Sequence, residues 1–106
     1  MIGFLQGTPL RTLPGSVLLD VGGVGYELNV SLATYYELQR LGEGVSVGLW
    51  VHTQVREDAI SLFGFWSERE KEIFLKLITV TGIGPRLAQT VLSGMPPEDL
   101  AAALAA

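Results

Sequence analysis

Residues 73–94, IFLKLITVTGIGPRLAQTVLSG, contain two apolar periodic segments joined by a glycine-rich turn. Before the turn, apolar side chains recur at helical spacing, which predicts a helix over residues 67–79. Pro85 suits the first turn of a second helix, because an N–H group at that position would have no acceptor within the helix. Residues 81–84 interrupt the two segments, so the whole stretch has the pattern of a helix-hairpin-helix.

The turn of this motif has the composition of an anion-binding loop. Gly82 and Gly84 allow backbone conformations that are closed to other residues, and they remove side chains that would block a close approach. N–H groups of the turn and of the helix that starts at Pro85 would point outward, where the helix dipole favours negative charge. Arg86 could add a charged contact to the same phosphate, without reading bases. The alternative is a glycine turn that only lets two helices pack closely.

The composition indicates a packed globular protein. The chain has 106 residues, of which 48% are hydrophobic and 17% are charged, enough for one modest domain or one small domain with part of another. It has no cysteine and a single histidine, so we expect neither disulfides nor a metal site. We also expect no cofactor. The first residues do not resemble a signal peptide, and no apolar run is long enough to span a bilayer. A soluble, cytoplasmic protein is expected.

The overall charge argues weakly against a nucleic-acid partner. Eleven acidic residues against seven basic ones give a net charge of −4, whereas most affinity for a nucleic-acid backbone comes from positive charge. Net charge is a global sum, however, and binding depends on where the charges lie. The distribution of charge must therefore decide.

The first 65 residues read as strands broken by turns. Leu32–Leu41 has helical spacing and ends at Gly42, and the other apolar runs are short and rich in Val, Leu and Ile. Five strands with one small helix indicate a compact barrel. The predicted strands are Ile2–Gly7, Ser16–Val21, Tyr26–Val30, Val45–Val55 and Ala59–Phe65.

The turn between the last two strands carries two adjacent carboxylates, Glu57 and Asp58, after Arg56. Acidic residues are ordinary at the exposed end of a hairpin, and this is the structural interpretation. On a DNA-binding face, the same pair would repel phosphate. Both interpretations stay open at this point.

The remaining motifs favour structure over catalysis. The run at residues 22–25, GGVG, lacks the Lys-Ser/Thr of a phosphate loop and precedes a strand, so it predicts a hairpin turn. Most aromatic side chains are expected in the core, and His52 is expected on a strand surface. No Ser-His-Asp, Cys-His or spaced metal-ligand set can be assembled. The sequence offers binding chemistry and no evident bond-breaking chemistry.

Several stretches form a specific combination: MIGFLQGT, DVGGVGYELNV, VREDA with SLFGF, and SEREKEIFLKLITVTGIGPRLAQTVLSG. Together they closely resemble the N-terminal half of the RuvA family, the junction-recognition subunits of the bacterial branch-migration complex. The resemblance implies an α+β protein, with a five-stranded OB-type β-barrel over residues 1–65 and the first part of a helix-hairpin-helix domain over residues 66–106. A third helix that starts at Pro96 and stops at the chain end suggests a fragment.

This resemblance implies a non-catalytic subunit that binds four-way (Holliday) DNA junctions as a homotetramer, or as an octamer of two tetramers. The implied partners are junction DNA, the hexameric ATPase motor RuvB, which a C-terminal domain outside this chain would contact, and the endonuclease RuvC. By position, Glu57 and Asp58 correspond to an acidic pin at the centre of the tetramer, and Arg56 beside them would contact the DNA backbone. The first phosphate-gripping hairpin corresponds to Gly82, Ile83, Gly84 and Arg86.

Two departures and two rival functions remain. The family often has a basic residue where this chain has Phe4, which puts a phosphate contact there in doubt. It also often has Lys where Arg86 stands, and this change is mild because the charge is kept.

One rival is an oligomerisation or protein-interaction module that does not bind DNA. The other is a helix-hairpin-helix enzyme such as a base-excision glycosylase, which would need a catalytic Lys or Asp after the hairpin. No lysine follows Lys76, and only Asp99 comes late.

Overall fold

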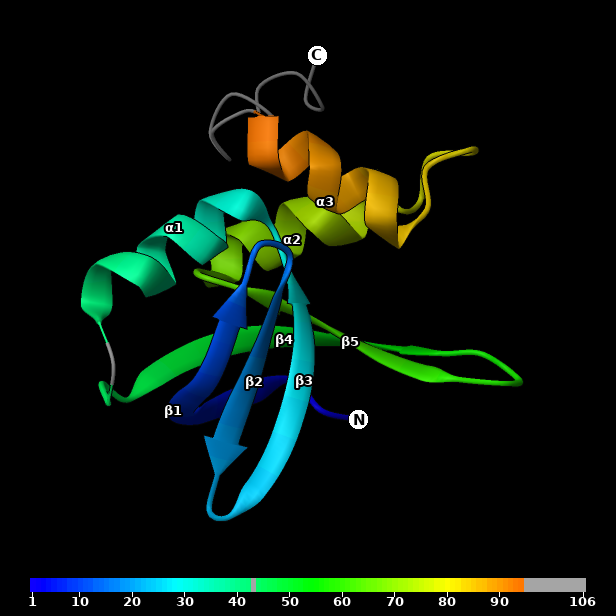
Figure 1. Cartoon of the computed structure of the whole chain (residues 1–106). Helices are drawn as coiled ribbons and strands as arrows, with labels where there is room; N and C mark the ends of the chain where they lie inside the picture. The colour runs from blue at the N-terminus through cyan, green and yellow to red at the C-terminus, as the bar shows by residue number, and fades with distance from the viewer. Residues whose placement is uncertain (43, 95–106) are drawn as a thin grey trace.

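Within residues 1–42 and 44–94, which the computed structural model describes, five strands curve into a closed barrel and three helices lie along one side of it (Figure 1). Around the barrel the strands follow the order β1-β2-β3-β5-β4. In chain order, the elements are β1 (Phe4–Leu13), β2 (Ser16–Val21), β3 (Val24–Val30), α1 (Leu32–Leu41), β4 (Val47–Val55), β5 (Ile60–Phe65), α2 (Glu68–Leu77) and α3 (Pro85–Gly94).

β1 closes the barrel because it pairs with two different neighbours, first with β4 and then with β2. Gly7 lies at the changeover, where a Cβ atom would overlap the carbonyl oxygen of Asp20 in β2. The register with β2 shifts between Pro9 and Arg11, and such a bulge bends a strand. The predicted end of this strand at residue 7 was wrong. A proline is tolerated at a bulge, so the strand continues to Leu13.

The inside of the barrel is filled by side chains from alternate positions of the strands. β3 and β5 run parallel, whereas the other neighbouring pairs are antiparallel, and α1 connects β3 to β4. This strand order is that of an OB-type barrel, and it confirms the predicted α+β fold class. The most deeply buried residues of this barrel core include Leu19, Leu28, Leu49 and Val51.

A second core lies between the outer face of β5 and the helices α2 and α3. Phe74 of α2 is at its centre, with ring centroids 5.5 Å from Phe63 and 4.8 Å from Phe65 of β5. Packing of this kind removes large apolar areas from water and holds the helices against the barrel. The buried residues of the second core are Phe63, Phe65, Ile73, Phe74, Leu77, Ala88 and Leu92.

Polar contacts also tie α3 to the barrel. The Nε2 atom of Gln89 donates to the carbonyl oxygen of Asn29 in β3 over 2.9 Å, and the Nδ2 atom of Asn29 donates to the carbonyl of Leu62 in β5 over 3.1 Å. At the other end of α3, the Oγ atom of Ser93 accepts the N–H of Leu32 at the start of α1, over 2.9 Å. These directional bonds set the orientation of α3 relative to the strands.

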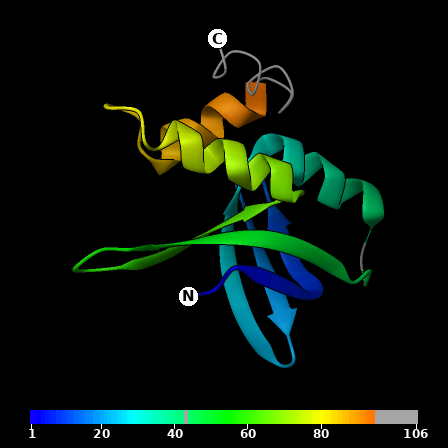
Figure 2. The same ribbon diagram turned by 180° about the vertical axis from the view of Figure 1, so that it is seen from behind.

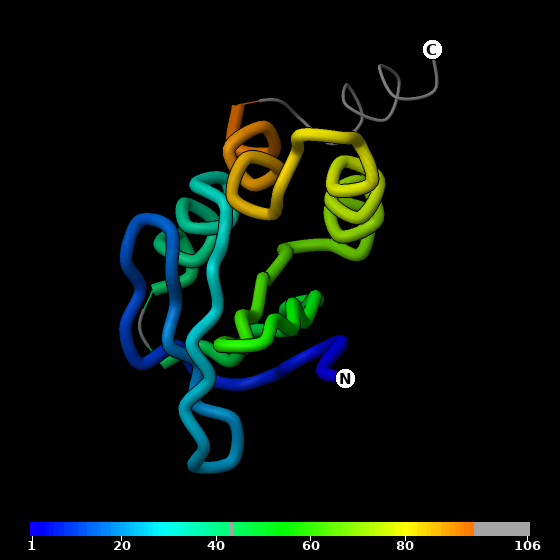
Figure 3. Tube along the Cα trace, turned by 90° about the vertical axis from the view of Figure 1, so that its right-hand side faces the viewer, coloured from blue at the N-terminus to red at the C-terminus, as the bar shows by residue number. Residues whose placement is uncertain are grey.

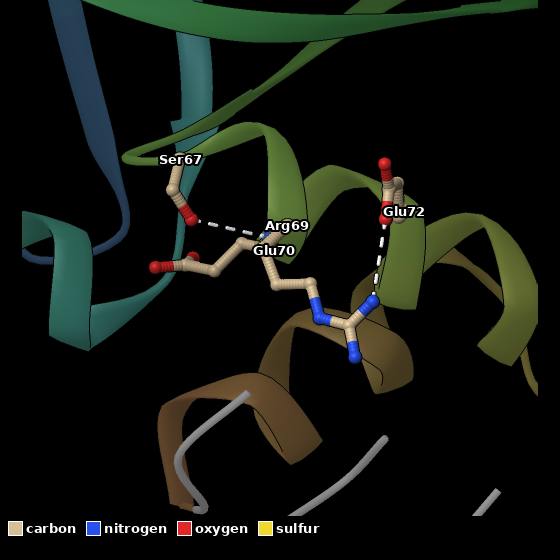
Figure 4. Close-up of polar contacts among 4 residues, drawn as sticks. All are labelled: Ser67, Arg69, Glu70 and Glu72. Atoms are coloured by element: carbon tan, nitrogen blue, oxygen red, sulfur yellow. Dashed lines mark hydrogen bonds and ion pairs between the residues drawn. The ribbon is translucent and has the colours of Figure 1, made fainter. Parts of the chain in front are cut away.

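The N-terminus of α2 has the cap that its sequence predicts. The Oγ atom of Ser67 accepts the N–H of Glu70 over 3.2 Å, as the capping-box pattern requires (Figure 4). Arg69 and Glu72 form an exposed ion pair at 3.5 Å on the same helix, a type of contact that contributes little to stability. The helix ends at Leu77 and not at residue 79, because the chain then enters a series of turns.

The helix that was expected from Pro96 lies outside the described residues. Among the helices of residues 1–42 and 44–94, none has the length and apolar character needed to cross a membrane.

Candidate nucleic-acid interface

The turn between α2 and α3 is built from consecutive tight turns. The N–H groups of Thr79, Val80 and Ile83 donate to carbonyls three residues earlier, over 3.0–3.2 Å. Gly82 has φ of +89°, a conformation that residues with a side chain rarely adopt. The side chain of Ile83 packs against the second core and so anchors the turn to the folded body. The N–H of Ile83 is already bonded to the carbonyl of Val80 and is not available to an anion. The contribution of Ile83 is therefore the packing of its side chain.

The start of α3 presents backbone donors with no acceptor in the helix. The first hydrogen bond of the helix runs from the N–H of Ala88 to the carbonyl of Gly84, over 3.0 Å. The earlier amides, such as those of Arg86 and Leu87, have no carbonyl four residues before them within the helix. The Arg86 side chain is exposed beside them. An anion placed here would meet N–H dipoles and a guanidinium group together.

Gly84 differs from Gly82 in what it requires. Its φ is not positive, and no heavy atom lies within 4 Å of the place where its Cβ would be. The expectation that both glycines adopt conformations closed to other residues is therefore confirmed for Gly82 and wrong for Gly84. A side chain at position 84 would enter open space.

The β4–β5 hairpin projects well beyond the barrel, as Figures 1 and 2 show. Its turn is closed by a hydrogen bond from the N–H of Arg56 to the carbonyl of Ala59 over 2.8 Å. Glu57 and Asp58 are exposed at the apex, and we call these two residues the acidic tip. In the described part of the chain, neither carboxylate makes an ion pair. Their charge is therefore presented to solvent.

The hairpin and the α2–α3 turn project on the same side of the molecule, and Figure 3 shows the turn above the hairpin from that side. Between them lies a groove of about 340 Å³, which we call the arginine groove. It brings Arg56, at the end of β4, together with Arg86, at the start of α3. Its lining residues are Gln54, Arg56, Ser61, Phe63, Gly84, Pro85, Arg86 and Leu87. Positive charge gathers here although the chain as a whole is acidic.

Three residues near this groove were missed or misplaced from sequence. Gln54 and Ser61 are cross-strand partners that line it, and the only available signal was that Gln54 precedes Arg56 by two residues on one face of a strand. His52 was expected on a strand surface. It is instead partly buried, with its ring centroid 5.6 Å from that of Phe74. Packing of α2 on the barrel covers it.

The aromatic side chains divide between core and surface. Phe63 and Phe65 are buried, as predicted, and Trp50 packs against the second core, whereas Tyr36 is exposed. Phe4 is 46% exposed and lies edge-on against Trp50, with ring centroids 5.0 Å apart. Position 4 therefore presents an aromatic pair and no charge. Among residues 1–42 and 44–94, no three His, Asp or Glu side chains gather in a way that could hold a metal ion.

By its fold, this protein belongs to the class of α+β proteins in which a closed five-stranded OB-type barrel is followed by a helix-hairpin-helix. The sequence profile described as the RuvA N terminal domain matches residues 1–64. The chain belongs to the RuvA family and corresponds to the N-terminal portion of its members.

Curated relatives extend the similarity through the helices. The Holliday junction branch migration complex subunit RuvA of Syntrophobacter fumaroxidans is 51% identical over 100 residues, which cover 94% of this chain and 50% of the relative. The subunit of the same name from Delftia acidovorans is 52% identical over 104 residues, 98% of this chain and 54% of the relative. That from Geobacter sulfurreducens is 49% identical over 104 residues, 98% of this chain and 51% of the relative. The chain spans about half the length of the curated relatives it matches.

Proposed function

We propose that this chain binds four-way DNA junctions by their structure and holds them open and square-planar for branch migration by a partner ATPase motor, in recombination and repair. One observation carries the proposal. The arginine groove and the acidic tip lie on the same side of the molecule and present opposite charges. The names of the relatives, which call those proteins subunits of the Holliday junction branch migration complex, point to the same ligand.

The DNA arms are held through their phosphates. Arg56 and Arg86 supply charge from two different elements, and the first amides of α3 supply N–H donors beside Gly84. Contacts of this type fix the position of a duplex without reading its sequence. They also make binding sensitive to salt, because each neutralised phosphate releases condensed counterions. Ile83 contributes by anchoring the turn against the second core.

The acidic tip acts at the crossover by repulsion. Two like charges 4 Å apart interact with about 1 kcal/mol in water and about 4 kcal/mol at an effective dielectric near 20, before screening by salt. In a tetramer, Glu57 and Asp58 of every copy would face the phosphates at the centre. That energy biases the junction against its stacked form and helps to separate strands, without cutting a bond. The acidity of the chain is then part of the mechanism.

We further propose that the chain assembles as a homotetramer, which a second tetramer can convert to an octamer. Val55 and Ile60, paired on the face of the hairpin opposite the arginine groove, are 55% and 70% exposed. An apolar pair beside the acidic tip is favourable where copies of the hairpin meet. The subunit is non-catalytic and needs no cofactor, the motor RuvB supplies the work, and RuvC resolves the junction. The division into a barrel of residues 1–65 and a helical region of residues 66–106 belongs to this proposal.

A gel-shift competition tests the proposal. We expect this chain to bind a labelled four-way junction in a salt-sensitive manner, with linear duplex and single strand as poor competitors. Arg56→Ala and Arg86→Ala should each lower junction affinity by about tenfold and reduce the salt slope by about 1. Arg40→Ala, which removes an exposed arginine of α1, is the matched control and should change neither. No DNA binding would favour the protein-interaction module instead, and equal affinity for duplex and junction would contradict recognition of the junction by its structure.

A further inference from the structure

Gln54 lies in the arginine groove between the acidic tip and the second core. It sits on β4 two residues before Arg56, so both side chains lie on the same face of the hairpin. Ser61 of β5 is its cross-strand partner and lines the same groove. The lining contains the guanidinium groups of Arg56 and Arg86 and no carboxylate. Gln54 is thus a neutral polar side chain in a positively charged groove.

The amide of Gln54 has a defined orientation. Its Oε1 atom lies 3.1 Å from the Nε2 atom of His52. Because an amide oxygen can only accept, the ring nitrogen of His52 is the donor in this pair. The amide nitrogen of Gln54 is therefore turned away from the ring, and in the described part of the chain it makes no hydrogen bond. Two N–H donors are left for a ligand in the groove.

His52 is itself held by the body of the protein. Its ring packs against Phe74, which is fully buried in the second core, and its cross-strand partner is Phe63, which lines the groove. A ring fixed in this way loses little further freedom when a ligand binds. An amide oriented before binding costs less to order than a mobile one, and this favours affinity.

We propose that Gln54 donates a hydrogen bond to a backbone phosphate of DNA lying in the arginine groove, between Arg56 and Arg86, and that His52 is the residue that positions it. This inference rests on the proposed function and adds a contact to it. A hydrogen bond to an ionised phosphate is stronger than one between neutral groups. Since Gln54 carries no charge, the contact adds affinity without releasing further counterions.

Junction binding by a Gln54→Met variant tests the contact. Methionine is close to glutamine in length and removes both amide functions. We expect about tenfold weaker binding of the four-way junction, the size that the loss of one hydrogen bond to a charged group produces. The salt slope should stay unchanged, whereas Arg86→Ala lowers it by about 1. Gln39→Met makes the same chemical change on exposed α1 and should bind as the unaltered chain does.

A double-mutant cycle separates positioning by His52 from a structural role. His52→Phe keeps an aromatic ring against Phe74 and removes the donor to Gln54. We expect His52→Phe to weaken binding severalfold when Gln54 is present and to have no further effect in the Gln54→Met background. A role for His52 in stability alone would weaken both backgrounds equally. Thermal unfolding of each variant, compared with the unaltered chain, shows that the folded state is retained.

The outcomes distinguish this inference from the proposed function. If Arg86→Ala loses affinity while Gln54→Met and Gln54→Glu bind as the unaltered chain does, the contact is absent and the proposed function stands. Gln54→Glu is included because its carboxylate has nearly the shape of the amide but repels phosphate. We expect it to lose more junction affinity than Gln54→Met does. If the unaltered chain binds no DNA at all, the proposed function and the contact are both overturned. Equal losses in Gln54→Met and Gln39→Met would also overturn the contact.

Discussion

The β4–β5 hairpin and the α2–α3 turn project on the same side of the molecule, yet they differ in which chemical groups they present. At the tip of the β-hairpin, Arg56 and Ala59 use backbone groups to close the turn, and the side chains of Glu57 and Asp58 reach solvent. At the helical turn, Gly84 has no side chain, and the first amides of α3 are the groups presented. One turn thus offers negative side chains and the other positive backbone dipoles.

The two projections also differ in how they are supported. The α2–α3 turn is anchored by the side chain of Ile83 in the second core, and α3 is tied to β3 through Gln89. The end of the β-hairpin extends away from the helices, with Val55 and Ile60 exposed. Under the proposed function this difference is expected. Backbone donors that bind phosphate need a fixed support because they cannot adjust, whereas a tip that repels phosphate through its charge tolerates a freer support.

The largest effect should follow from removing the support of the α2–α3 turn. Phe74→Ala deletes the central ring of the second core, which is 0% exposed, and should lower the free energy of unfolding by about 3–5 kcal/mol. This is a large part of the stability of a typical domain. Urea denaturation measures it. Leu75→Ala is the control, because Leu75 is the next residue of α2 and is 36% exposed. It should lower the free energy of unfolding much less. Similar losses in the two variants would mean that the second core does not hold the helices.

A smaller effect separates the two glycines of the helical turn. Gly82→Ala places a side chain at φ of +89° and should cost about 1–2 kcal/mol of stability. Gly84→Ala meets no atom within 4 Å and should cost at most about 1 kcal/mol, while it weakens junction binding by obstructing the phosphate. Thermal unfolding and gel shifts of the same two proteins give both quantities. Full junction affinity in Gly84→Ala would place the phosphate elsewhere.

The smallest effect concerns the acidic tip, and its sign is diagnostic. Replacing Glu57 by Gln and Asp58 by Asn keeps the shape of the tip and removes its charge. Junction binding should become roughly threefold to tenfold tighter at low salt, and the gain should shrink as salt screens the repulsion. In a longer chain that includes the domain proposed to contact the motor, the same substitutions should impair motor-driven branch migration. Titration of the junction at two salt concentrations measures the gain, and weaker binding would contradict repulsion by the tip.

Several elements of the fold could be predicted from the sequence because their signals are local. Leu32–Leu41 and Ser16–Val21 have the bounds that apolar spacing predicted, and the cap at Ser67 follows from the residue type and its spacing to Glu70. The length of β1 could not be predicted in this way. Pro9 reads as the end of a strand, and only the bulge against β2 makes it acceptable within one.

The candidate site was predictable in parts and not as a whole. Gly82, Arg86, Glu57 and Asp58 stand out within their own turns, and their proposed roles remain predictions. Nothing in the spacing of residues indicated that Gln54 and Arg86 line one groove, or that His52 is covered by α2. Those relations depend on contacts between distant segments.

The sequence by itself determined the types of the elements and the chemistry of the two turns, because periodicity, caps and glycine conformations act over a few residues. It also determined the family, since RuvA similarity is carried by the residues themselves. Only the tertiary structure decided that Arg56 and Arg86 meet in one groove on the side where the acidic tip projects. The physical reason is that closure of the barrel through β1 and burial of the second core set distances between residues far apart in the chain.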